Sequence, residues 1–263
     1  MTDLEKLQTI IDESDNIVFL GGAGVSTESG IPDFRSTDGL YAKDYDNVSP
    51  EEILSAGTFK NNTELFWKFY NDKILMRNSD KEILPNIAHY KLAELEKAGK
   101  LKAIITQNID DLHQKAGSKV VYQIHGNILK YYCVGRKHEY DLKYILGTTE
   151  PVPKCPQCGS KLKPDVVLYD EPLPDKIFRN AILAVKQAKT LIVAGTSLRV
   201  YPAASLLDYF YGDNLILINR DETPADSKAT LVFHDSIGKI LGGIKINGTE
   251  EKWFFYRFFY FYW

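Results

Sequence analysis

The residues best suited to binding a nucleotide lie in a glycine-rich stretch, residues 20–35. An apolar segment of strand length, residues 16–20, leads into this stretch, and Ser26 and Thr27 inside it suit the start of a helix. A strand, a glycine turn and a helix start let backbone N–H groups approach a pyrophosphate, with the positive end of a helix dipole aimed at it. The glycines by themselves are equally typical of a tight turn that binds no ligand.

The glycine spacing departs from the usual dinucleotide fingerprint, G-x-G-x-x-G. Gly22 and Gly24 fit it, but Thr27 holds the place of the third glycine. The fingerprint also has an acidic residue about 20 residues further on, after a second strand. The aspartates in that range follow no apolar strand. We therefore expect a nucleotide site unlike that of a dehydrogenase, in which Phe34 and Arg35 bring an aromatic ring and a guanidinium over a ribose and phosphates.

Apolar segments of strand length alternate with helical patterns along the chain. The expected strands are residues 16–20, 101–106, 120–124, 190–194 and 214–218, with a short β-like run at 165–169; the expected helices are residues 3–14, 87–97, 174–188 and 202–210, with helical pieces within 48–78. Strands that are apolar throughout are typical of a sheet buried on both faces. The pattern predicts an α/β fold, a Rossmann-like parallel sheet with helices on both faces.

Polar side chains follow these strands where each one ends. They are Gln107, Asn108 and Asp110 after 101–106, His125 after 120–124, Thr196 and Ser197 after 190–194, and Asn219 after 214–218. Ligands bind at the carboxyl ends of the strands in an open α/β sheet, so these groups indicate one crevice. A histidine such as His125, taken alone, is more often a core residue with satisfied hydrogen bonds than a catalytic base.

Three cysteines indicate a metal site. Cys155 and Cys158 form a Cys-x-x-Cys pair followed by a glycine, which is typical of zinc ribbons, and Cys133 precedes them. A closed structural site needs a fourth ligand, and Arg136 stands where a second Cys-x-x-Cys would supply it. The nearest substitute is His138. The alternatives are a structural zinc held by these three cysteines and His138, or a ribbon-like insertion whose degraded site is empty.

The amino-acid composition limits the classes of protein to which the chain can belong. The chain has 263 residues, of which 44% are hydrophobic and 25% charged, as in ordinary globular proteins. Its net charge of −3 gives no reason to expect a nucleic-acid partner. No apolar run approaches the roughly 20 residues of a membrane span, and the charged amino terminus does not resemble a signal peptide. We expect a cytoplasmic protein without a membrane or nucleic-acid partner, with a monomer favoured.

Several motifs in fixed order resemble those of the sirtuin family of NAD-dependent protein deacylases, and its compact bacterial members most. They are residues 22–26 (GAGVS) with 30–35 (GIPDFR), 106–110 (TQNID), 125–126 (HG), the cysteine insertion, 163–169 (KPDVVLY), 195–198 (GTSL) with 200–202 (VYP), and 218–219 (IN). The resemblance covers residues 12–241. It implies an NAD-binding Rossmann-like domain (1–35, 86–130 and 163–245) and a small domain made of a cofactor loop with a helical insertion (36–85) and a zinc-ribbon-like insertion (131–162).

The resemblance implies a reaction that consumes NAD. The carbonyl oxygen of acetyl-lysine, or of another acyl-lysine, attacks C1′ of the nicotinamide ribose, and nicotinamide leaves. His125 then acts as a general base on a ribose hydroxyl, which suits the ordinary histidine pKa of about 6.5. The hydroxyl oxygen attacks the imidate carbon, and water completes the breakdown to free lysine and O-acyl-ADP-ribose. A protein ADP-ribosyltransferase using the same NAD site and a catalytically weak NAD-binding protein are the alternatives.

The resemblance also assigns roles by position. The implied catalytic residues are His125, Asn108 and Asp110. The implied NAD-binding residues are Gly22, Ala23, Gly24, Thr27, Phe34, Arg35, Gln107, Asn108, Ile109, Asp110, His125, Thr196, Ser197, Asn219, Asp235 and Ile237. An acyl-lysine protein substrate would add as a β-strand, held by backbone hydrogen bonds, between Val166, Val167, Leu168 and Tyr169 on one side and Leu198 and Val200 on the other.

Acyl choice depends on a further segment, in which some bacterial sirtuins carry a Tyr-x-x-Arg pair for acidic acyl groups. Here the pair is Tyr70 and Lys73, so we expect acetyl-lysine as the primary substrate and succinyl-lysine as a secondary one. Two positions depart from the family, because Gly21 replaces threonine or serine and Asp170 replaces glycine. The tail, residues 246–263, is unlike the family's ends, and its run of aromatic side chains would be an aggregation hazard if exposed.

Overall fold

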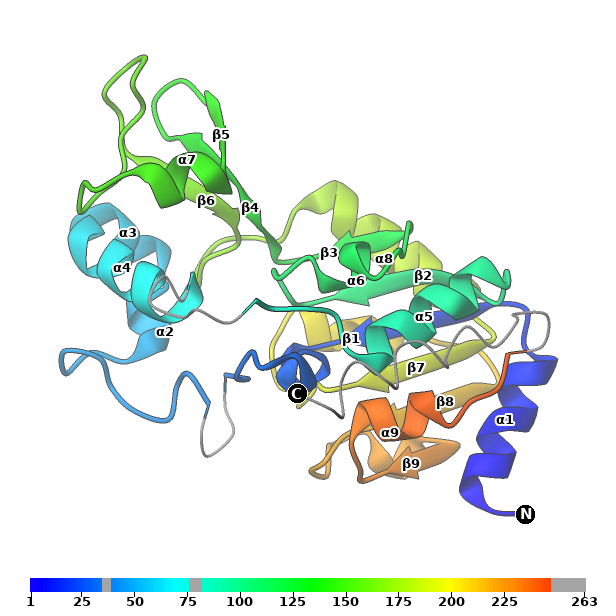
Figure 1. Cartoon of the computed structure of the whole chain (residues 1–263). Helices are drawn as coiled ribbons and strands as arrows, with labels where there is room; N and C mark the ends of the chain where they lie inside the picture. Colours follow the sequence, from blue (N-terminus) through cyan, green and yellow to red (C-terminus); the bar gives the residue numbers. More distant parts are fainter. Residues whose placement is uncertain (35–38, 76–81, 247–263) are drawn as a thin grey trace.

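A six-stranded parallel sheet forms the centre of the larger lobe (Figure 1). The structure, a computed structural model, describes residues 1–34, 39–75 and 82–246. The strand order is β3-β2-β1-β7-β8-β9, and every neighbouring pair is parallel. The bounds are β1 Ile17–Gly21, β2 Leu101–Thr106, β3 Val121–Gln123, β7 Thr190–Ala194, β8 Asn214–Ile218 and β9 Leu231–Phe233. The expected parallel sheet is confirmed; β9 was not predicted, because three residues are too few to show a period.

Helices cover both faces of this sheet. One face packs against α1 (Asp3–Glu13), α5 (Ile87–Lys97) and α9 (Ile237–Gly242), and the other against α8 (Asp175–Gln187) and the 3-10 helix η4 (Ala203–Tyr209). Successive residues of β1 alternate between the two cores: Ile17 and Phe19 belong to the first, Val18 and Leu20 to the second. Burial of both faces explains why the strands are apolar throughout. The short helices α6 (Leu112–Lys115) and η5 (Asp226–Lys228) follow β2 and β8.

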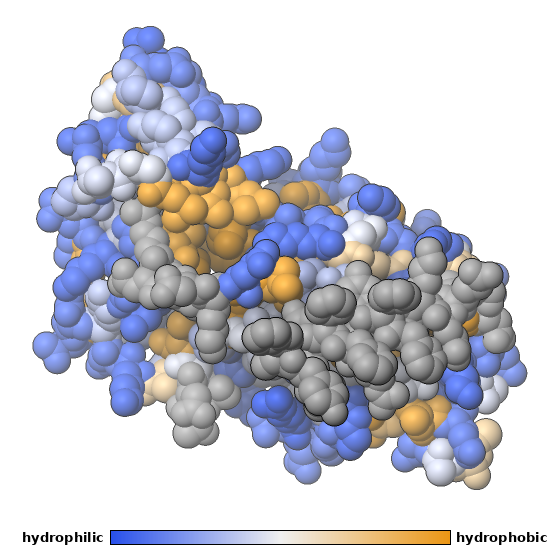
Figure 2. All heavy atoms as spheres, in the orientation of Figure 1, coloured by the Kyte–Doolittle hydropathy of each residue, from blue (hydrophilic) through white to orange (hydrophobic). Residues whose placement is uncertain are grey.

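The two insertions fold together into a smaller lobe (Figure 1). Its antiparallel sheet, β5-β4-β6, consists of β4 (Gly126–Cys133), β5 (Glu139–Asp141) and β6 (Leu162–Val166), with α7 (Leu142–Gly147) after β5. The helical insertion supplies α2 (Pro50–Ile53), α3 (Ala56–Asn61), α4 (Thr63–Phe69) and the π-helical turn η3 (Tyr70–Ile74). Trp67 and Tyr131 join the two insertions in one core, with ring centroids 6.2 Å apart. Figure 2 shows apolar side chains gathered on the surface where the lobes meet.

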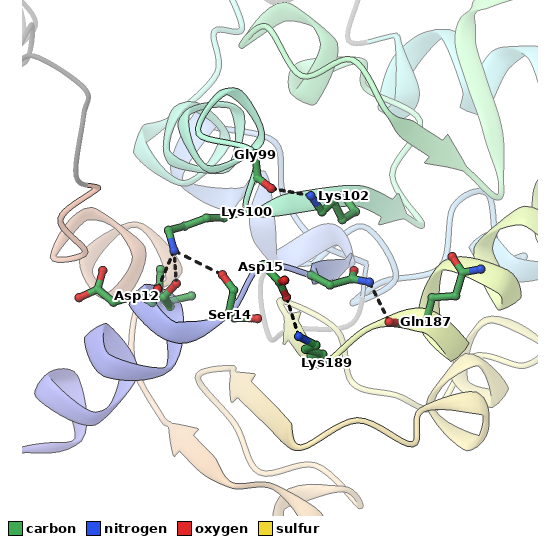
Figure 3. Close-up of polar contacts among 10 residues, drawn as sticks. Asp12, Ser14, Asp15, Gly99, Lys100, Lys102, Gln187 and Lys189 are labelled. Carbon is green, nitrogen blue, oxygen red and sulfur yellow. Dashed lines mark hydrogen bonds and ion pairs between the residues drawn. The ribbon is translucent and has the colours of Figure 1, made fainter.

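Lysine side chains at the amino edge of the parallel sheet bond to the end of α1 and to the loop before β1 (Figure 3). Lys189 pairs with Asp15, between α1 and β1, at 2.9 Å. Lys100 Nζ donates hydrogen bonds to three carbonyl oxygens at the end of α1, those of Ile11, Asp12 and Ser14. The last carbonyls of a helix have no partner within the helix, so Lys100 completes the carboxyl end of α1. The glycine turn and the polar strand ends lie at the opposite, carboxyl edge.

The structure differs from expectation after the glycine turn. Instead of one helix, two short 3-10 helices follow β1, η1 (Ala23–Val25) and η2 (Thr27–Ser29), and they end at Gly30 with a positive φ of 86°. The physical reason is that Ser26, the expected helix cap, donates its hydroxyl hydrogen bond to Asp110 instead. The turn itself therefore does not continue into a regular α-helix.

Two smaller expectations also change. The helix expected at 202–210 is the 3-10 helix η4. The β-like run expected at 165–169 is shifted, because β6 ends at Val166 and the next backbone N–H, of Val167, bonds to the His125 carbonyl oxygen at 2.9 Å. Among the residues that the structure describes, no helix is long and apolar enough to cross a membrane.

Candidate active site and metal centre

The loops that follow β1 and β7 touch where the strand order reverses. Gly24 N donates to the Gly195 carbonyl oxygen at 2.9 Å, and Gly22 N to that of Ala194 at 3.1 Å. A Cβ on Gly22 would lie 2.7 Å from Gly195 O, and one on Gly24 would lie 2.7 Å from Gly195 Cα. Both glycines are therefore required for contact between the loops. The contact places the glycine turn at the carboxyl edge, where open α/β sheets bind ligands.

Gly21 makes room for an aromatic ring. A Cβ at Gly21 would lie 2.7 Å from Cε1 of Phe19, on the same side of β1. The Phe19 ring in turn packs edge-on against His113, with ring centroids 6.0 Å apart. A larger residue than glycine would have to displace that ring, so the unusual glycine at this position accompanies the packing of Phe19 on His113.

Ser26, Asn108 and Asp110 form a hydrogen-bonded cluster at the carboxyl edge. Ser26 Oγ donates to Asp110 Oδ2 at 2.5 Å and accepts from Asn108 Nδ2 at 3.0 Å. The second oxygen of Asp110 accepts from Leu112 N at the start of α6, at 3.0 Å. Ser26 and Asn108 are buried. The cluster holds a carboxylate in a fixed orientation, and a carboxylate oxygen is an acceptor for an amide NH₂ such as that of nicotinamide.

Ser26 lies in one of the motifs that resemble the sirtuin family, but it was not predicted as a site residue. Its only signals were a hydroxyl and its position beside the glycines. Its partner Asp110 lies 84 residues further along the chain, and no local pattern connects the two.

A second series of hydrogen bonds runs from β2 to β8. Gln107 Nε2 donates to Thr196 Oγ1 at 3.0 Å, and Thr196 N donates to Asn219 Oδ1 at 2.9 Å. The other end of the amide, Asn219 Nδ2, is buried without a partner in the described part of the chain. A buried N–H left unsatisfied costs about 1–3 kcal/mol. A ribose hydroxyl at this edge would supply the missing acceptor, so the donor set fits a dinucleotide.

His125 is oriented by the backbone of the same strand end. Its Nδ1 lies 3.0 Å from the Gln107 carbonyl oxygen. A carbonyl oxygen only accepts, so Nδ1 carries the proton and Nε2 is left with its lone pair. Burial lowers the pKa of His125, while the bond to Gln107 opposes part of that decrease. A neutral imidazole with a free Nε2 can accept a proton at neutral pH.

The chain around residues 166–169, predicted to contact the substrate, is held by a largely buried ion pair. Lys163 Nζ lies 2.9 Å from Glu171 Oε2 and also donates to the Val166 carbonyl oxygen at 2.8 Å. Glu171 Oε2 accepts from Leu168 N at 2.9 Å. Tyr169 pairs with the smaller lobe, because its N donates to the Leu54 carbonyl oxygen. The segment predicted to receive a peptide is therefore held from two sides.

Tyr70 and Lys73, the residues predicted to contact an acidic acyl group, lie in different surroundings. Tyr70 is fully buried in the core of the smaller lobe and its ring stacks on Phe66, with centroids 5.5 Å apart. Lys73 is exposed, pairs with Asp72 at 3.3 Å and lies over the Tyr45 ring. The π-helical turn that contains both residues places one in the core and the other at the surface.

The remaining predicted residues occupy varied positions. Thr27 Oγ1 donates to the Gly24 carbonyl oxygen, and Ser197 is exposed. Asp235 pairs with Lys239, whereas the side chain of Ile237 is buried in the first core, which leaves only its backbone for an adenine. The others that are described at the carboxyl edge or beside it are Ala23, Phe34, Ile109, Leu198 and Val200. Arg35 and the tail from residue 247 lie outside the described residues.

Four side chains of the smaller lobe converge as a metal-binding group. The ligand atoms of Cys133, His138, Cys155 and Cys158 all lie within 4.8 Å of one another. His138 Nδ1 is 3.2 Å from Cys155 Sγ, and Cys133 Sγ is 3.6 Å from Cys158 Sγ. The hairpin between β4 and β5 supplies the first two residues, and the loop before β6 supplies the other two. Three thiolates and one imidazole are a donor set typical of structural zinc.

Arg136 does not leave the metal-binding group a ligand short. His138, two residues further on, turns its ring inward and takes the fourth place. The backbone N–H groups of Arg136 and His138 lie 3.4 Å and 3.3 Å from Cys133 Sγ, as donors that stabilise a thiolate. Tyr140 OH lies 2.9 Å from Cys155 Sγ. The chain thus replaces a Cys-x-x-Cys with a Cys-x₄-His.

A sequence model of the Sir2 family matches residues 22–202. The chain belongs to the Sir2 family. An NAD-dependent protein deacetylase of Clostridium perfringens is 55% identical to this Sir2-family chain, over 92% of this chain and 98% of its own length. The family resemblance inferred from the motifs is therefore confirmed.

Solved structures of Sir2 share the fold of this Sir2-family chain. A histidine-to-alanine variant of Sir2 with a deacetylated p53 peptide and 3′-O-acetyl-ADP-ribose has a TM-score of 0.84 and 37% identity, covering 93% of this chain and all (100%) of its own. A structure of Sir2 with a p53 peptide and NAD⁺ has a TM-score of 0.80 and 37% identity, covering 92% of this chain and 96% of its own. The parallel sheet with a smaller lobe is the Sir2 fold.

Proposed function

We propose that this Sir2-family chain is an NAD-dependent protein deacetylase. It removes acetyl groups from lysine side chains of proteins and produces nicotinamide, O-acetyl-ADP-ribose and free lysine. The observation that carries the proposal is the cluster of Ser26, Asn108 and Asp110 at the carboxyl edge, joined through Gln107 to an oriented His125. The names of the relatives and the ligands of the Sir2 complexes support the same reaction.

The residues of this chain divide the work between binding and proton transfer. NAD supplies an activated glycosidic carbon, C1′, from which nicotinamide leaves. Asp110 accepts from the nicotinamide carboxamide, and Ser26 and Asn108 hold that carboxylate in place. Asn219 Nδ2 binds a ribose hydroxyl on the adenosine side. His125 takes a proton from a ribose hydroxyl at Nε2, since its Nδ1–H is held by the Gln107 carbonyl oxygen.

The acetylated peptide binds as an added strand between Val166–Tyr169 and Leu198–Val200. Two features support this mode. Lys163, Glu171 and the smaller lobe fix the backbone of the first segment. Its N–H groups at Val167, Leu168 and Tyr169 are already bonded, so a peptide would donate to its carbonyl oxygens. Leu198, just after β7, has a positive φ of 54°, so the chain turns there and does not continue the strand. Recognition through backbone hydrogen bonds predicts loose sequence preference around a fixed lysine.

Acetyl-lysine is the favoured substrate over succinyl-lysine. A succinyl carboxylate would need a cation that is not already paired and a nearby hydroxyl. Lys73 is paired with Asp72, and Tyr70 is buried in the aromatic core.

Zinc bound by Cys133, His138, Cys155 and Cys158 has a structural role in this proposal. The four ligands close a tetrahedral site, so no position is left open for a substrate. They connect the β4–β5 hairpin to the loop before β6 and so stabilise the smaller lobe.

The test is an incubation with NAD and an acetyl-lysine peptide, followed by mass spectrometry of peptide, protein and nucleotide products. The proposal predicts loss of acetyl from the peptide together with O-acetyl-ADP-ribose, and turnover about 10²- to 10⁴-fold slower in His125→Ala. ADP-ribose attached to protein would instead indicate a transferase. Absence of NAD turnover by the wild type, with NAD still bound, would indicate a catalytically weak NAD-binding protein.

A further inference from the structure

Glu28 joins the glycine turn to the loop that follows β9. Its Oε1 accepts one hydrogen bond from Ser236 Oγ and another from Gly238 N, both at 2.9 Å. Gly238 leaves room for this contact, because a Cβ there would meet the Glu28 carboxylate. Glu28 lies in η2, within the glycine-rich stretch, and is 208 residues away from Ser236 in the sequence. One carboxylate thus connects two loops at the carboxyl edge of the parallel sheet.

The same carboxylate completes the amino end of α9. The first N–H groups of a helix have no partner within the helix, and a glutamate three residues after the cap often supplies an acceptor. In α9 that position is Lys239, and its side chain pairs with Asp235. Glu28 supplies the acceptor from another loop instead. The start of α9 is therefore held against the glycine turn.

The order of the strands places the adenine end of NAD beside this contact. The loop after β2 carries Asp110, proposed to bind nicotinamide, and β8 leads to Asn219, proposed to bind a ribose hydroxyl; β1 and β7 lie between them, and β9 is the next strand beyond β8. Asn219 N donates to the Phe233 carbonyl oxygen at 3.0 Å, so the loop after β9 begins next to the ribose site. A dinucleotide that extends from Asp110 to Asn219 would therefore reach residues 234–237 with its adenine.

We propose that Glu28 is a positioning residue for the adenosine half of NAD. The inference rests on the NAD site of the proposed function and deepens it. Glu28 fixes residues 234–237 relative to the glycine turn, so that adenine and pyrophosphate fit their places at the same time. The charge of Glu28 acts in the opposite direction, because a carboxylate near a pyrophosphate repels it. Loss of affinity on removal of this carboxylate would therefore come from lost positioning and not from lost charge.

The test compares a ligand of the adenosine half with a ligand of the nicotinamide end. Calorimetry measures the dissociation constant of ADP-ribose, and the deacetylation assay measures the inhibition constant of nicotinamide. Glu28→Ala should raise the dissociation constant of ADP-ribose and the KM for NAD by about three- to tenfold, as expected for the loss of about one hydrogen bond. The inhibition constant of nicotinamide and kcat should stay near their wild-type values, which general damage to the fold would not allow.

Three further variants separate positioning from charge and from folding. Glu28→Gln removes the charge but keeps an acceptor oxygen, so it should bind ADP-ribose nearly as wild type does. Ser236→Ala removes one of the two donors and should weaken ADP-ribose binding less than Glu28→Ala. Glu222→Ala is the matched control, because it removes an exposed carboxylate from the loop after β8, and it should not weaken ADP-ribose binding.

The outcomes distinguish this inference from the proposed function. Unchanged ADP-ribose affinity in Glu28→Ala, equal weakening of ADP-ribose and nicotinamide, or no rescue by Glu28→Gln would overturn the inference alone. Failure of wild type to bind ADP-ribose would overturn the proposed function as well.

Discussion

At the residue scale, His125 combines a fixed tautomer with a lowered basicity. The Gln107 carbonyl oxygen accepts from Nδ1, and burial disfavours the imidazolium, so the pKa of His125 is lower than its ordinary value. The base is active when neutral. A lower pKa therefore keeps it active at more acidic pH.

We predict that the acidic limb of kcat/KM against pH has an apparent pKa below the ordinary histidine value of about 6.5. His125→Ala should lower kcat by about 10²- to 10⁴-fold, the usual contribution of a general base, and leave NAD affinity nearly unchanged. Steady-state rates across the pH range and NAD titration of the variant measure both effects. An acidic limb above 6.5 would contradict the assignment.

Asp170 adopts a strained backbone conformation at a position where the sirtuin family has glycine. Its φ is 70°, in the left-handed region that glycine adopts without strain. We predict that Asp170→Gly raises the free energy of unfolding by about 0.5–1 kcal/mol, because relief of the left-handed strain exceeds the entropic cost of glycine. Urea unfolding measures this. The matched control is Asp208→Gly, inside η4, which should lower stability; a decrease in both variants would contradict the argument.

At the element scale, α5 and α6 meet through two buried histidines. The rings of His89 and His113 lie 4.7 Å apart. Burial lowers the pKa of His89 to about 4, and burial and His89 lower that of His113 to about 3. The unfolded chain takes up protons near the ordinary value of about 6.5, whereas the folded chain does not until lower pH. Folding stability is therefore lost as pH falls below 6.5 and regained as it rises.

We predict that the free energy of unfolding decreases between pH 6 and pH 4 by up to about 1.4 kcal/mol per pH unit for each of the two histidines. Urea unfolding at several pH values measures the slope. His113→Asn removes one titrating group. It should therefore reduce the slope by up to about 1.4 kcal/mol per pH unit. A stability that is independent of pH in this range would show that the pair is not neutral in the folded chain.

The metal-binding group is also an element-scale feature, because it connects a hairpin to a distant loop. We predict about one zinc ion per chain, closed by three thiolates and one imidazole. His138→Ala should lose most of the zinc and melt at a lower temperature, by about 2–4 °C for each kcal/mol lost. His234→Ala, a histidine outside the group, should keep the metal. Full zinc retention by His138→Ala would exclude the imidazole as a ligand.

The sequence predicts elements whose signal is local. The strands at 101–106, 190–194 and 214–218 and the helix at 87–97 agree with the structure residue for residue, because their apolar runs and caps lie within the segment. Contacts between distant segments leave no such local signal in the sequence. Neither the Ser26–Asp110 bond nor the buried histidine pair has a local signature. The helix expected after the glycine turn failed for this reason, since Ser26 bonds a residue on another loop.

At the scale of the whole molecule, the two lobes divide the proposed reaction between them. The carboxyl edge of the parallel sheet in the larger lobe gathers the polar groups proposed to bind NAD (Figure 1). The smaller lobe holds Tyr169, in the segment proposed to bind the peptide, through Leu54 and Ala56. The apolar surface where the lobes meet is consistent with a peptide strand binding there (Figure 2). The proposed active site therefore includes residues of both lobes.

The most direct test of this account is the stoichiometry of products. Wild type, NAD and an acetyl-lysine peptide are allowed to react until a fraction of the peptide is consumed, and nicotinamide, O-acetyl-ADP-ribose and deacetylated peptide are quantified together. We expect equal amounts of the three products and no reaction without NAD. Release of free acetate from the peptide in the absence of NAD, or consumption of NAD without deacetylated peptide, would contradict it.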